Sequence, residues 1–514
     1  MPWLLNATWL LPALLAAVLA LLPAGRPGLL RSWSLAGALL NLLLIAALLA
    51  VYLGQAEPAA SEATVSRLAF ASRLAWFPAL GIDFFTGADA INLCMMLLAA
   101  VIAVGGILVS WRLEHRVKAF QVLLQILLAG TYGCFISFDL FTFFFFNELT
   151  LIPTYLLIAL FGSPIRWQRP DGSAGEPIAP TFAAMKLTLM LFAGSALIIV
   201  GLAGIATQAG TFDLLRLAAE PLPASSQLWI FPCLFGGFAI LGSVFPFHTW
   251  SPMGHAAAPT AISMFLAGVH MKLGGYGCLR AAMSFLPIGA LEWLPVFLGL
   301  GTISVVLGAW IALRQRDLKY INAYASISHV GLVTVGFASL TALGLRGGVL
   351  QMLSHGFVTA LVFALIGAVY RRTQTRLVPE LGGLMRQMPI LGVAFVLAGF
   401  AVVGLPLSSS FVAELTLFFG LFADEPSPWR VFCGVLCILT VIVTAVYVLR
   451  TVNGVVHGPA QERFAGLPDA DGPERLAIGL LLACILALGL VPGSIVDAID
   501  ASLLPILNNL ETAR

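Results

Sequence analysis

The chain has 514 residues, of which 60% are hydrophobic and only 10% are charged, and its formal net charge at pH 7 is +2. Its mean hydropathy is +1.00, and its apolar runs are long enough to cross a membrane, which takes about 20 residues. This composition indicates a polytopic α-helical membrane protein. It excludes a β-barrel, whose strands alternate in pieces of about 10 residues. No basic run suggests a nucleic-acid partner.

Apolar runs of span length follow one another along the whole chain, and we count about 14 of them. They lie roughly at 3–23, 32–53, 88–110, 118–136, 138–161, 181–206, 228–248, 257–283, 288–313, 320–342, 348–370, 390–420, 430–452 and 474–494. The first run has no basic residues before it, so we expect a retained span and not a cleaved signal. The polar stretches between the runs are too short for a separate catalytic domain. We therefore predict a single membrane domain over 1–514.

Basic residues are distributed unevenly between the connecting loops. With the N-terminus placed outside, about 17 Lys and Arg fall on the inside and about 7 on the outside, which is the bias that sets orientation. Arg280 is then counted on the outside and Lys319 in an inside loop, whereas Lys186 and Lys272 lie within spans. We expect both termini on the outer side of a bacterial inner membrane.

The seven cysteines are scattered through the apolar runs, and none forms a CxxC pair. Cys433 and Cys437 share a helix face, but small buried thiols ordinarily serve as packing residues. No glycine-rich nucleotide loop follows a predicted strand. We therefore expect neither a metal nor a cofactor on this chain.

Three charged residues lie deep inside apolar runs: Glu148 in FTFFFFNELTLIPTYLLIALFG, Lys272 in AISMFLAGVHMKLGGYG and Glu414 in SSSFVAELTLFFGLF. A charge at bilayer depth costs roughly 2.5 kcal/mol or more, so such residues usually face a bundle interior and belong to an ion or proton pathway. Their alternative role is structural, as groups hydrogen-bonded to a neighbouring helix. The aromatic run before Glu148 is interpreted as packing.

Two spans are interrupted by Gly and Pro. One break lies in FAILGSVFPFHTWSP around Pro246, and the other lies in FAVVGLPLSSSFVAE at Gly404 and Pro406. Paired interruptions about 160 residues apart, or five ordinary spans, favour two inverted repeats with an ion site between them. We predict repeats at 118–283 and 288–452, preceded by N-terminal helices at 1–117 and followed by a C-terminal helix at 453–514.

Five stretches together resemble one family closely. They are FFFFNELTLIPTYLLIALFG, FPFHTWSPMGHAAAPTAISMFLAGVHMKLGGYG, RDLKYINAYASISHVGLVTVGFASL, LSHGFVTALVFALIGAVYRRTQTR and GLPLSSSFVAELTLFFG. These are similar to the antiporter-like subunits of respiratory complex I, and the resemblance extends from about Asp139 to His457. Glu414, where some sister subunits carry Lys, is typical of the M type. The chain also lacks room for the long lateral helix of the L type.

The resemblance implies an all-α fold of about 14 transmembrane helices, with two inverted five-helix repeats and broken helices 7 and 12. It implies that protons pass laterally and across the membrane along acidic, Lys and His side chains. In this sequence those side chains are Glu148, Lys186, Lys272, His329, His355 and Glu414. It also implies that NADH or ferredoxin, flavin, iron–sulfur clusters and quinone belong to partner subunits. L- and N-type subunits are the expected neighbours.

One residue of the family pattern is missing. Members usually carry a Lys in helix 7, five residues before the Pro of a P-[LF]-H-x-W motif. Here the motif begins at Pro246, so the position is Leu241. That Lys is the usual partner of the helix 5 Glu, which is Glu148. We therefore expect either that Lys186 pairs with Glu148 or that Glu148 is neutral, and we favour the pair.

Three of these polar residues have two possible roles each. Lys186 stands near the start of a span, where it could instead extend to the inner surface. His329 and His355 suit proton relay because their unperturbed pKa lies near 6.5, or they are packing residues.

Three further histidines and one acid have local roles. His248 and His255 flank the inside end of helix 7 as loop anchors or proton-uptake groups. His270 is a relay residue or contacts a neighbouring helix or subunit. Asp139 is expected to cap a helix.

The sequence thus favours a proton-translocating M-type subunit of a complex I-like NADH–quinone oxidoreductase, with the redox chemistry in other subunits. Three alternatives stay open. They are a D-type subunit of a multisubunit cation/proton antiporter, a subunit of a membrane-bound hydrogenase or formate hydrogenlyase, and a non-pumping specialised paralogue, which Leu241 supports.

Overall fold

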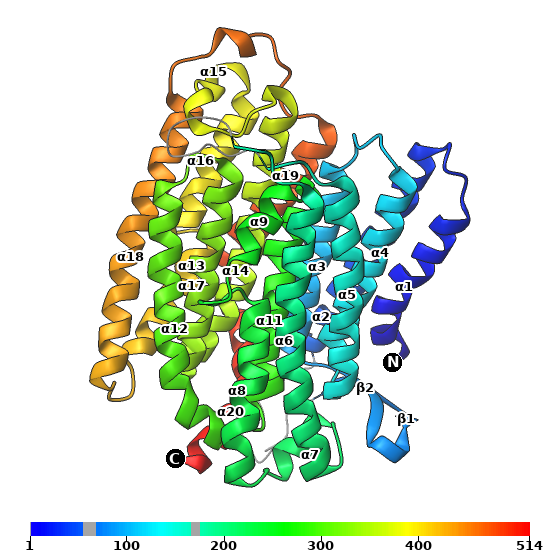
Figure 1. Ribbon diagram of the computed structural model, residues 1–514, viewed down its shortest axis with the longest axis vertical. Coiled ribbons are helices and arrows are strands. Elements are labelled where there is room, and N and C mark those ends of the chain that lie inside the picture. Colours follow the sequence, from blue (N-terminus) through cyan, green and yellow to red (C-terminus); the bar gives the residue numbers. More distant parts are fainter. Residues whose placement is uncertain (1, 55–67, 166–174) are drawn as a thin grey trace.

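The computed structural model describes residues 2–54, 68–165 and 175–514 as a bundle of long helices (Figure 1). The N-terminal part contains α1 (Pro2–Leu21), α2 (Pro27–Gly54), β1 (Ala69–Phe77), β2 (Ile82–Ala88) and α3 (Ala90–Val109). The region predicted as the first repeat contains α4 (Val117–Ile136), α5 (Leu140–Phe161), α6 (Pro180–Ala209), α7 (Leu214–Ala219), α8 (Ala224–Leu241), α9 (Trp250–Ala257), α10 (Thr260–Phe265) and α11 (Met271–Gly277). The remainder contains α12 (Pro287–Arg314), α13 (Leu318–Ala338), α14 (Ala342–Thr373), α15 (Leu384–Gln387), α16 (Pro389–Val403), α17 (Ser409–Phe422), α18 (Pro428–Val452), α19 (Gly472–Leu490) and α20 (Gly493–Ala513).

Within the described ranges, 12 helices are long and apolar enough to cross a membrane. They coincide with twelve of the predicted runs, so the prediction of an all-α polytopic membrane protein is confirmed. The other two runs consist of shorter consecutive helices. Run 257–283 contains α10 and α11 with two π-helical segments, Leu266–His270 and Cys278–Met283, and run 390–420 contains α16 and α17. The count of about 14 spans and the inverted relation of the repeats stay predictions.

Both predicted helix breaks are present. α8 ends at Leu241 and α9 begins at Trp250, so the segment around Pro246 connects two half-helices. α16 ends at Val403, and Gly404 follows with a φ of +76°, a left-handed conformation that a residue without a Cβ adopts easily. α17 then begins with Ser408 as its cap, whose hydroxyl accepts a hydrogen bond from a backbone N–H.

The two ends of the bundle carry different elements. In Figure 1 both chain termini lie toward the lower end, the N-terminus near the hairpin and the C-terminus near α20, whereas α15 lies at the upper end. We call the upper end the α15 end. α1 and α18 lie on opposite flanks of the bundle in this view.

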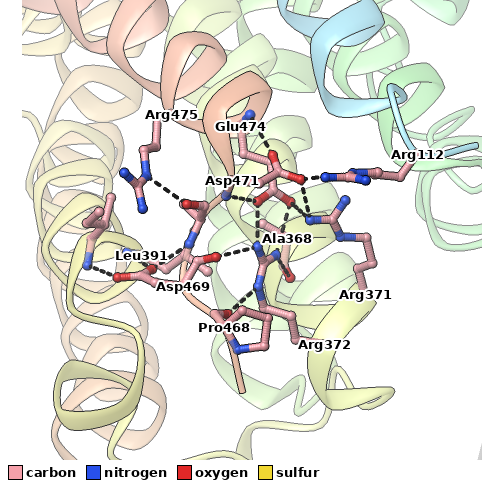
Figure 2. Close-up of polar contacts among 12 residues, drawn as sticks. Arg112, Ala368, Arg371, Arg372, Leu391, Pro468, Asp469, Asp471, Glu474 and Arg475 are labelled. Atoms are coloured by element: carbon pink, nitrogen blue, oxygen red, sulfur yellow. Dashed lines mark hydrogen bonds and ion pairs between the residues drawn. The ribbon is translucent and has the colours of Figure 1, made fainter. Parts of the chain in front are cut away.

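A cluster of charged residues holds the start of α19 at the α15 end (Figure 2). Arg372 forms a bidentate pair with Glu474, with N–O distances of 2.7 and 3.0 Å. Arg371 contacts both Glu474 and Asp471, at 3.0 and 2.9 Å. Burial raises the pKa of the Asp471 carboxyl, but hydrogen bonds from Arg371, the Glu474 backbone and Arg112 lower it more, so the pKa lies below its usual value. The ionised cluster therefore anchors α19.

Two elements were not predicted from the sequence. β1 and β2 form an antiparallel hairpin within a stretch that was expected to be a loop. α20 follows α19 where a single C-terminal helix was expected, and one face of it is buried through Ile499, Leu503 and Ile506. Asp500 on α20 pairs with Arg346 of α14, with an Nε–Oδ1 distance of 2.6 Å. α20 is thus amphipathic and too polar to have been recognised by a search for spans.

Candidate ion pathway

Lys272 lies on α11, with a π-helical segment immediately on either side. Such segments are frequent at functional sites. The residue is only 1% exposed. Its ammonium group donates to the carbonyl of Ala267 and lies 2.8 Å from Nδ1 of His355 on α14. An ammonium group can only donate, so Nδ1 of His355 accepts this hydrogen bond when Lys272 is charged.

Gly274 allows α11 to approach α8 closely. A Cβ atom at Gly274 would lie 2.4 Å from the backbone nitrogen of Gly242 and 2.6 Å from the carbonyl oxygen of Phe238. Real Cβ atoms do not make such contacts with backbone, so only glycine fits here. The helix that carries Lys272 is therefore packed directly against the end of α8.

His355, His329 and Glu414 continue the polar chain from Lys272. The rings of His355 and His329, the latter on α13, stack with centroids 5.3 Å apart and planes inclined by 21°. Nδ1 of His329 lies 3.4 Å from Oε1 of Glu414 on α17 and 3.2 Å from Nε2 of Gln351. A protonated Nδ1 donates to Glu414, whereas an unprotonated Nδ1 accepts from Gln351. The protonation state of His329 therefore selects its partner.

The carboxylate of Glu414 reaches the break between α16 and α17. A Cβ atom at Gly404 would lie 3.0 Å from Oε2 of Glu414. Four of the six pathway residues implied by the resemblance thus form one chain, from Lys272 to the broken helix. The other two, Glu148 and Lys186, lie outside it.

Hydroxyl and amide groups that the sequence analysis missed branch from this chain. Oγ of Ser326 lies 3.2 Å from Nε2 of His355 and 3.2 Å from Oγ1 of Thr359. Nδ2 of Asn322 donates to the same Oγ1 at 3.1 Å. A signal was available, because Asn322, Ser326 and His329 recur at helical spacing on α13, as His355 and Thr359 do on α14.

A small cavity lies beside the two stacked histidines. His329, His355, Asn322, Thr359 and Ser410 are among the residues that line it. About 10 Å³ of it is open to the centre of a water-sized sphere, which is room for about one water molecule. A water molecule there would have several polar partners.

The first repeat lacks the expected ion pair. Glu148 on α5 accepts a 2.5 Å hydrogen bond from Oγ of Ser195 on α6. Lys186 forms no ion pair with Glu148, although the structure describes both side chains, so the favoured Lys186–Glu148 pair was a wrong prediction. The Nζ atom of Lys186 lies 3.2 Å from Sδ of Met253 instead. Leu241, at the family's Lys position, is buried at the end of α8.

The three accessory histidines lie in or beside the broken helix. His255 on α9 and His270 at the end of a π-helical segment are fully buried, and neither ring has a hydrogen-bond partner among the described residues. The ring of His255 stacks on Phe363, with centroids 5.2 Å apart. Nδ1 of His248 is also without a partner in this part of the chain. Within the described chain, His270 therefore makes no polar contact to a neighbouring helix.

Two basic residues that were counted on opposite sides of the membrane are buried, which the sequence did not predict. Arg280 pairs with Asp89, the cap of α3, and only 7% of its side chain is exposed. Nζ of Lys319 donates to the carbonyl oxygen of Ala258 at 2.6 Å. Both residues lie near the ends of helices, and each charged group contacts a polar group of the protein instead of water. The predicted cap is confirmed, because Asp139 accepts from the backbone N–H of Thr142 at 2.9 Å.

The described residues contain no cluster of metal-binding side chains. Across residues 2–54, 68–165 and 175–514, no group of three or more His, Cys, Asp or Glu side chains could hold a metal ion. The seven cysteines are free thiols, five of them buried. The polar chain from Lys272 to Glu414 is therefore the leading candidate site in the described structure.

Comparisons with known proteins agree on one family. Residues 137–442 match the family described as NADH:quinone oxidoreductase/Mrp antiporter, transmembrane. Over 520 residues the chain is 35% identical to NAD(P)H-quinone oxidoreductase chain 4 1 of Synechococcus sp. (strain JA-3-3Ab), covering 100% of this chain and 94% of that protein. The chain belongs to this family. NAD(P)H-quinone oxidoreductase chain 4 of Acaryochloris marina (strain MBIC 11017) is also 35% identical, over 83% of this chain and 78% of its own length.

Solved structures share the fold of this antiporter-like complex I subunit. A chain of respiratory complex I from Thermus thermophilus with bound NADH superposes with a TM-score of 0.84 at 28% identity, over 98% of this chain and 99% of that one. Chains of the membrane-bound sulfane sulfur reductase, an archaeal respiratory membrane complex, and of the Mrp complex from Dietzia sp. DQ12-45-1b give TM-scores of 0.82 and 0.80. Each covers 99% of both chains, and their identities of 22% and 20% support a shared fold alone.

Proposed function

We propose that the chain is a proton-translocating M-type subunit of a complex I-like NADH–quinone oxidoreductase. The observation that carries the proposal is the buried chain formed by Lys272, His355, His329 and Glu414. Each member can bind and release a proton, and each step is within reach of direct transfer or of one intervening water molecule. A purely structural role would not require four titratable side chains in sequence.

The contacts suggest how a proton travels along this chain. Lys272 passes a proton to Nδ1 of His355, and the water-sized cavity links His355 to His329. His329 then donates through Nδ1 to Glu414. Glu414 releases the proton at the break between α16 and α17, where freed backbone groups favour water.

The proposal extends to the surroundings of the chain. NADH or ferredoxin, flavin, iron–sulfur clusters and quinone would be bound by partner subunits and not by this chain. The neighbours in the membrane would be L- and N-type antiporter-like subunits. Both termini would face the outer side of a bacterial inner membrane. This orientation is supported by the position of the termini opposite the α15 end and by the Arg residues gathered near α19.

A second candidate is a specialised subunit whose first repeat does not conduct protons. Two observations favour it: Leu241 replaces the usual cation, and Glu148 is hydrogen-bonded to Ser195 instead of being paired with Lys186. In that case protons would pass only along the chain that begins at Lys272, near the end of the predicted first repeat, and continues through the second repeat to Glu414.

The test is to purify the assembly through a tag on this chain, identify its subunits by mass spectrometry, and reconstitute it in proteoliposomes. We expect quinone-reductase subunits to copurify and quinone reduction to drive proton movement that a Lys272→Met variant loses. Proton movement driven by a sodium or potassium gradient without any electron donor would instead identify a cation/proton antiporter. Copurifying hydrogenase subunits would identify the third class of assembly.

A further inference from the structure

A second and larger cavity opens between α13, α14, α16 and α18. About 40 Å³ of it is open to the centre of a water-sized sphere, four times the corresponding volume beside the histidines. Its walls come from the first two turns of α13, beginning at Leu318, and from the end of α18, up to Val452. The backbone N–H of Leu318 donates a hydrogen bond to the carbonyl oxygen of Arg376, in the segment that leads from α14 to α15. The cavity therefore lies toward the α15 end of the bundle.

This cavity adjoins the small cavity beside the histidines. Asn322, Ala325 and Val402 line both. Asn322 also begins the hydrogen-bonded sequence through Thr359 and Ser326 to Nε2 of His355. A wall of three residues therefore separates the larger cavity from the candidate pathway, and one of them, Asn322, donates to the first hydroxyl group of the sequence that leads to His355.

Three polar residues, Asn322, Tyr447 and Thr451, are among those that line the larger cavity, although most of its wall is apolar. The hydroxyl group of Tyr447 is buried, and no partner in the described chain lies in hydrogen-bonding geometry, although Thr444 is near enough to interact with it. Asn322 and Thr451 also line the cavity. A water molecule in a protein needs about two to four polar partners, and these side chains supply them.

We propose that this cavity is a water-filled inlet that delivers protons from the α15 end directly to His355, with Tyr447 and Asn322 holding the water. The inference rests on the proposed proton-translocating function and adds a supply route that bypasses the first repeat. Water in the larger cavity would pass a proton across the shared wall to water in the small cavity, which Thr359 lines, and that proton would displace one along the Thr359 and Ser326 hydroxyl groups. Each hydroxyl accepts one proton and releases another, so one proton reaches Nε2 of His355 when that nitrogen carries none.

The route accounts for the loss of the usual cation at Leu241. A subunit whose first repeat no longer takes up protons needs another source for the chain that ends at Glu414. The larger cavity lies within the predicted second repeat, and no residue of α8, which ends at Leu241, lines it. The pathway would then be fed within the second repeat alone.

The first test measures water access and does not depend on transport. Val402→Cys places a thiol in the wall shared by both cavities, and Val393→Cys is its control on the outer, 49% exposed side of the same helix. Both are made in the full chain within the assembled complex. A charged, membrane-impermeant methanethiosulfonate reagent reacts with hydrated thiolates, so it should label Val402→Cys from the α15 side at least about tenfold faster than Val393→Cys.

Two labelling results would overturn the inference. One is equal or absent labelling of both cysteines by the charged reagent. The other is reaction of Val402→Cys with an uncharged maleimide only, which would mean that the cavity is dry and holds an apolar chain such as a lipid tail. Adding Tyr447→Phe to Val402→Cys should lower the labelling rate, because the substitution removes a water-binding hydroxyl and keeps the ring. An unchanged rate would contradict the role of Tyr447.

The second test measures transport. Ala325→Leu fills the shared wall, and Ala17→Leu on the exposed face of α1 is the matched control. We expect Ala325→Leu and Tyr447→Phe to lose most of the proton translocation while the assembled complex and its electron transfer persist. Full translocation in both variants refutes the inlet. Should Lys272→Met also leave translocation intact, the proposed function fails whatever the labelling shows.

Discussion

Replacing Lys272 by Met removes the charge at the start of the candidate pathway and keeps much of the side-chain volume. The ammonium group makes two hydrogen bonds, to the carbonyl of Ala267 and to Nδ1 of His355. Their loss leaves two buried acceptors unpaired, at a cost of about 1–3 kcal/mol each. No opposite charge is stranded, because neither partner is a carboxylate. A multi-helix subunit packed on all sides should therefore still fold and assemble.

The effect on transport should be much larger than the effect on folding. Lys272 exchanges protons with Nδ1 of His355, and its positive charge beside that ring also controls whether His355 holds a proton that arrives at Nε2. Met can do neither. We expect proton translocation in reconstituted vesicles to fall at least about tenfold, which corresponds to a barrier raised by about 1.4 kcal/mol or more. Lys118→Met, at the partly exposed start of α4, is the matched control and should be neutral. Lys272→Arg should restore little, because Arg stays protonated. Full translocation by assembled Lys272→Met would refute the reasoning.

Four further predictions concern other residues of the structure. Glu414→Gln keeps the shape of the side chain but removes its titration, so translocation should fall while the complex assembles; failure to assemble would show that Glu414 is structural. Leu241→Lys should change translocation if the first repeat conducts protons, and if neither it nor Glu148→Gln has an effect, the first repeat is silent. Ser195→Ala removes the hydrogen bond to Glu148 and should lower the thermal stability of the complex, by about 1–3 kcal/mol of unfolding free energy; an unchanged melting temperature would show that water replaces the hydroxyl. The pKa of Asp471 is lowered in the folded protein, so its stabilising effect is present above its unfolded pKa of about 3.9 and is lost as the pH falls through the folded value. Proteolysis of the loop before α19 should therefore accelerate only below about pH 4, and Asp471→Asn should remove that dependence.

The sequence was sufficient to predict the class of fold and most of the central pathway. Long apolar runs predict spans because lipid offers no alternative partner for backbone groups, and twelve of them are present as single helices. Lys272, His329, His355 and Glu414 were found because ionisable groups at such depth are costly. The structure brings these four together, at distances that the sequence could not supply.

The rest depended on contacts between distant segments. The Lys186–Glu148 pair was expected because Leu241 replaces the usual partner of Glu148. The structure pairs Glu148 with Ser195 instead, and a hydroxyl group in a span gives little signal in the sequence. The burial of Arg280 was not predicted, because its pairing with Asp89 joins residues that are far apart in the sequence. α20 was missed because its polar face lowers its hydropathy, although its buried residues recur at helical spacing.

The central claim is that protons cross this subunit through His355, which contacts both Lys272 and Ser326. The most direct measurement is the number of protons translocated per electron pair by the reconstituted complex carrying His355→Gln. His457→Gln, at an exposed site beyond α18, is the control. The account predicts that the ratio falls in His355→Gln while electron transfer continues, and that it stays constant in the control. An unchanged ratio in assembled His355→Gln would contradict the account.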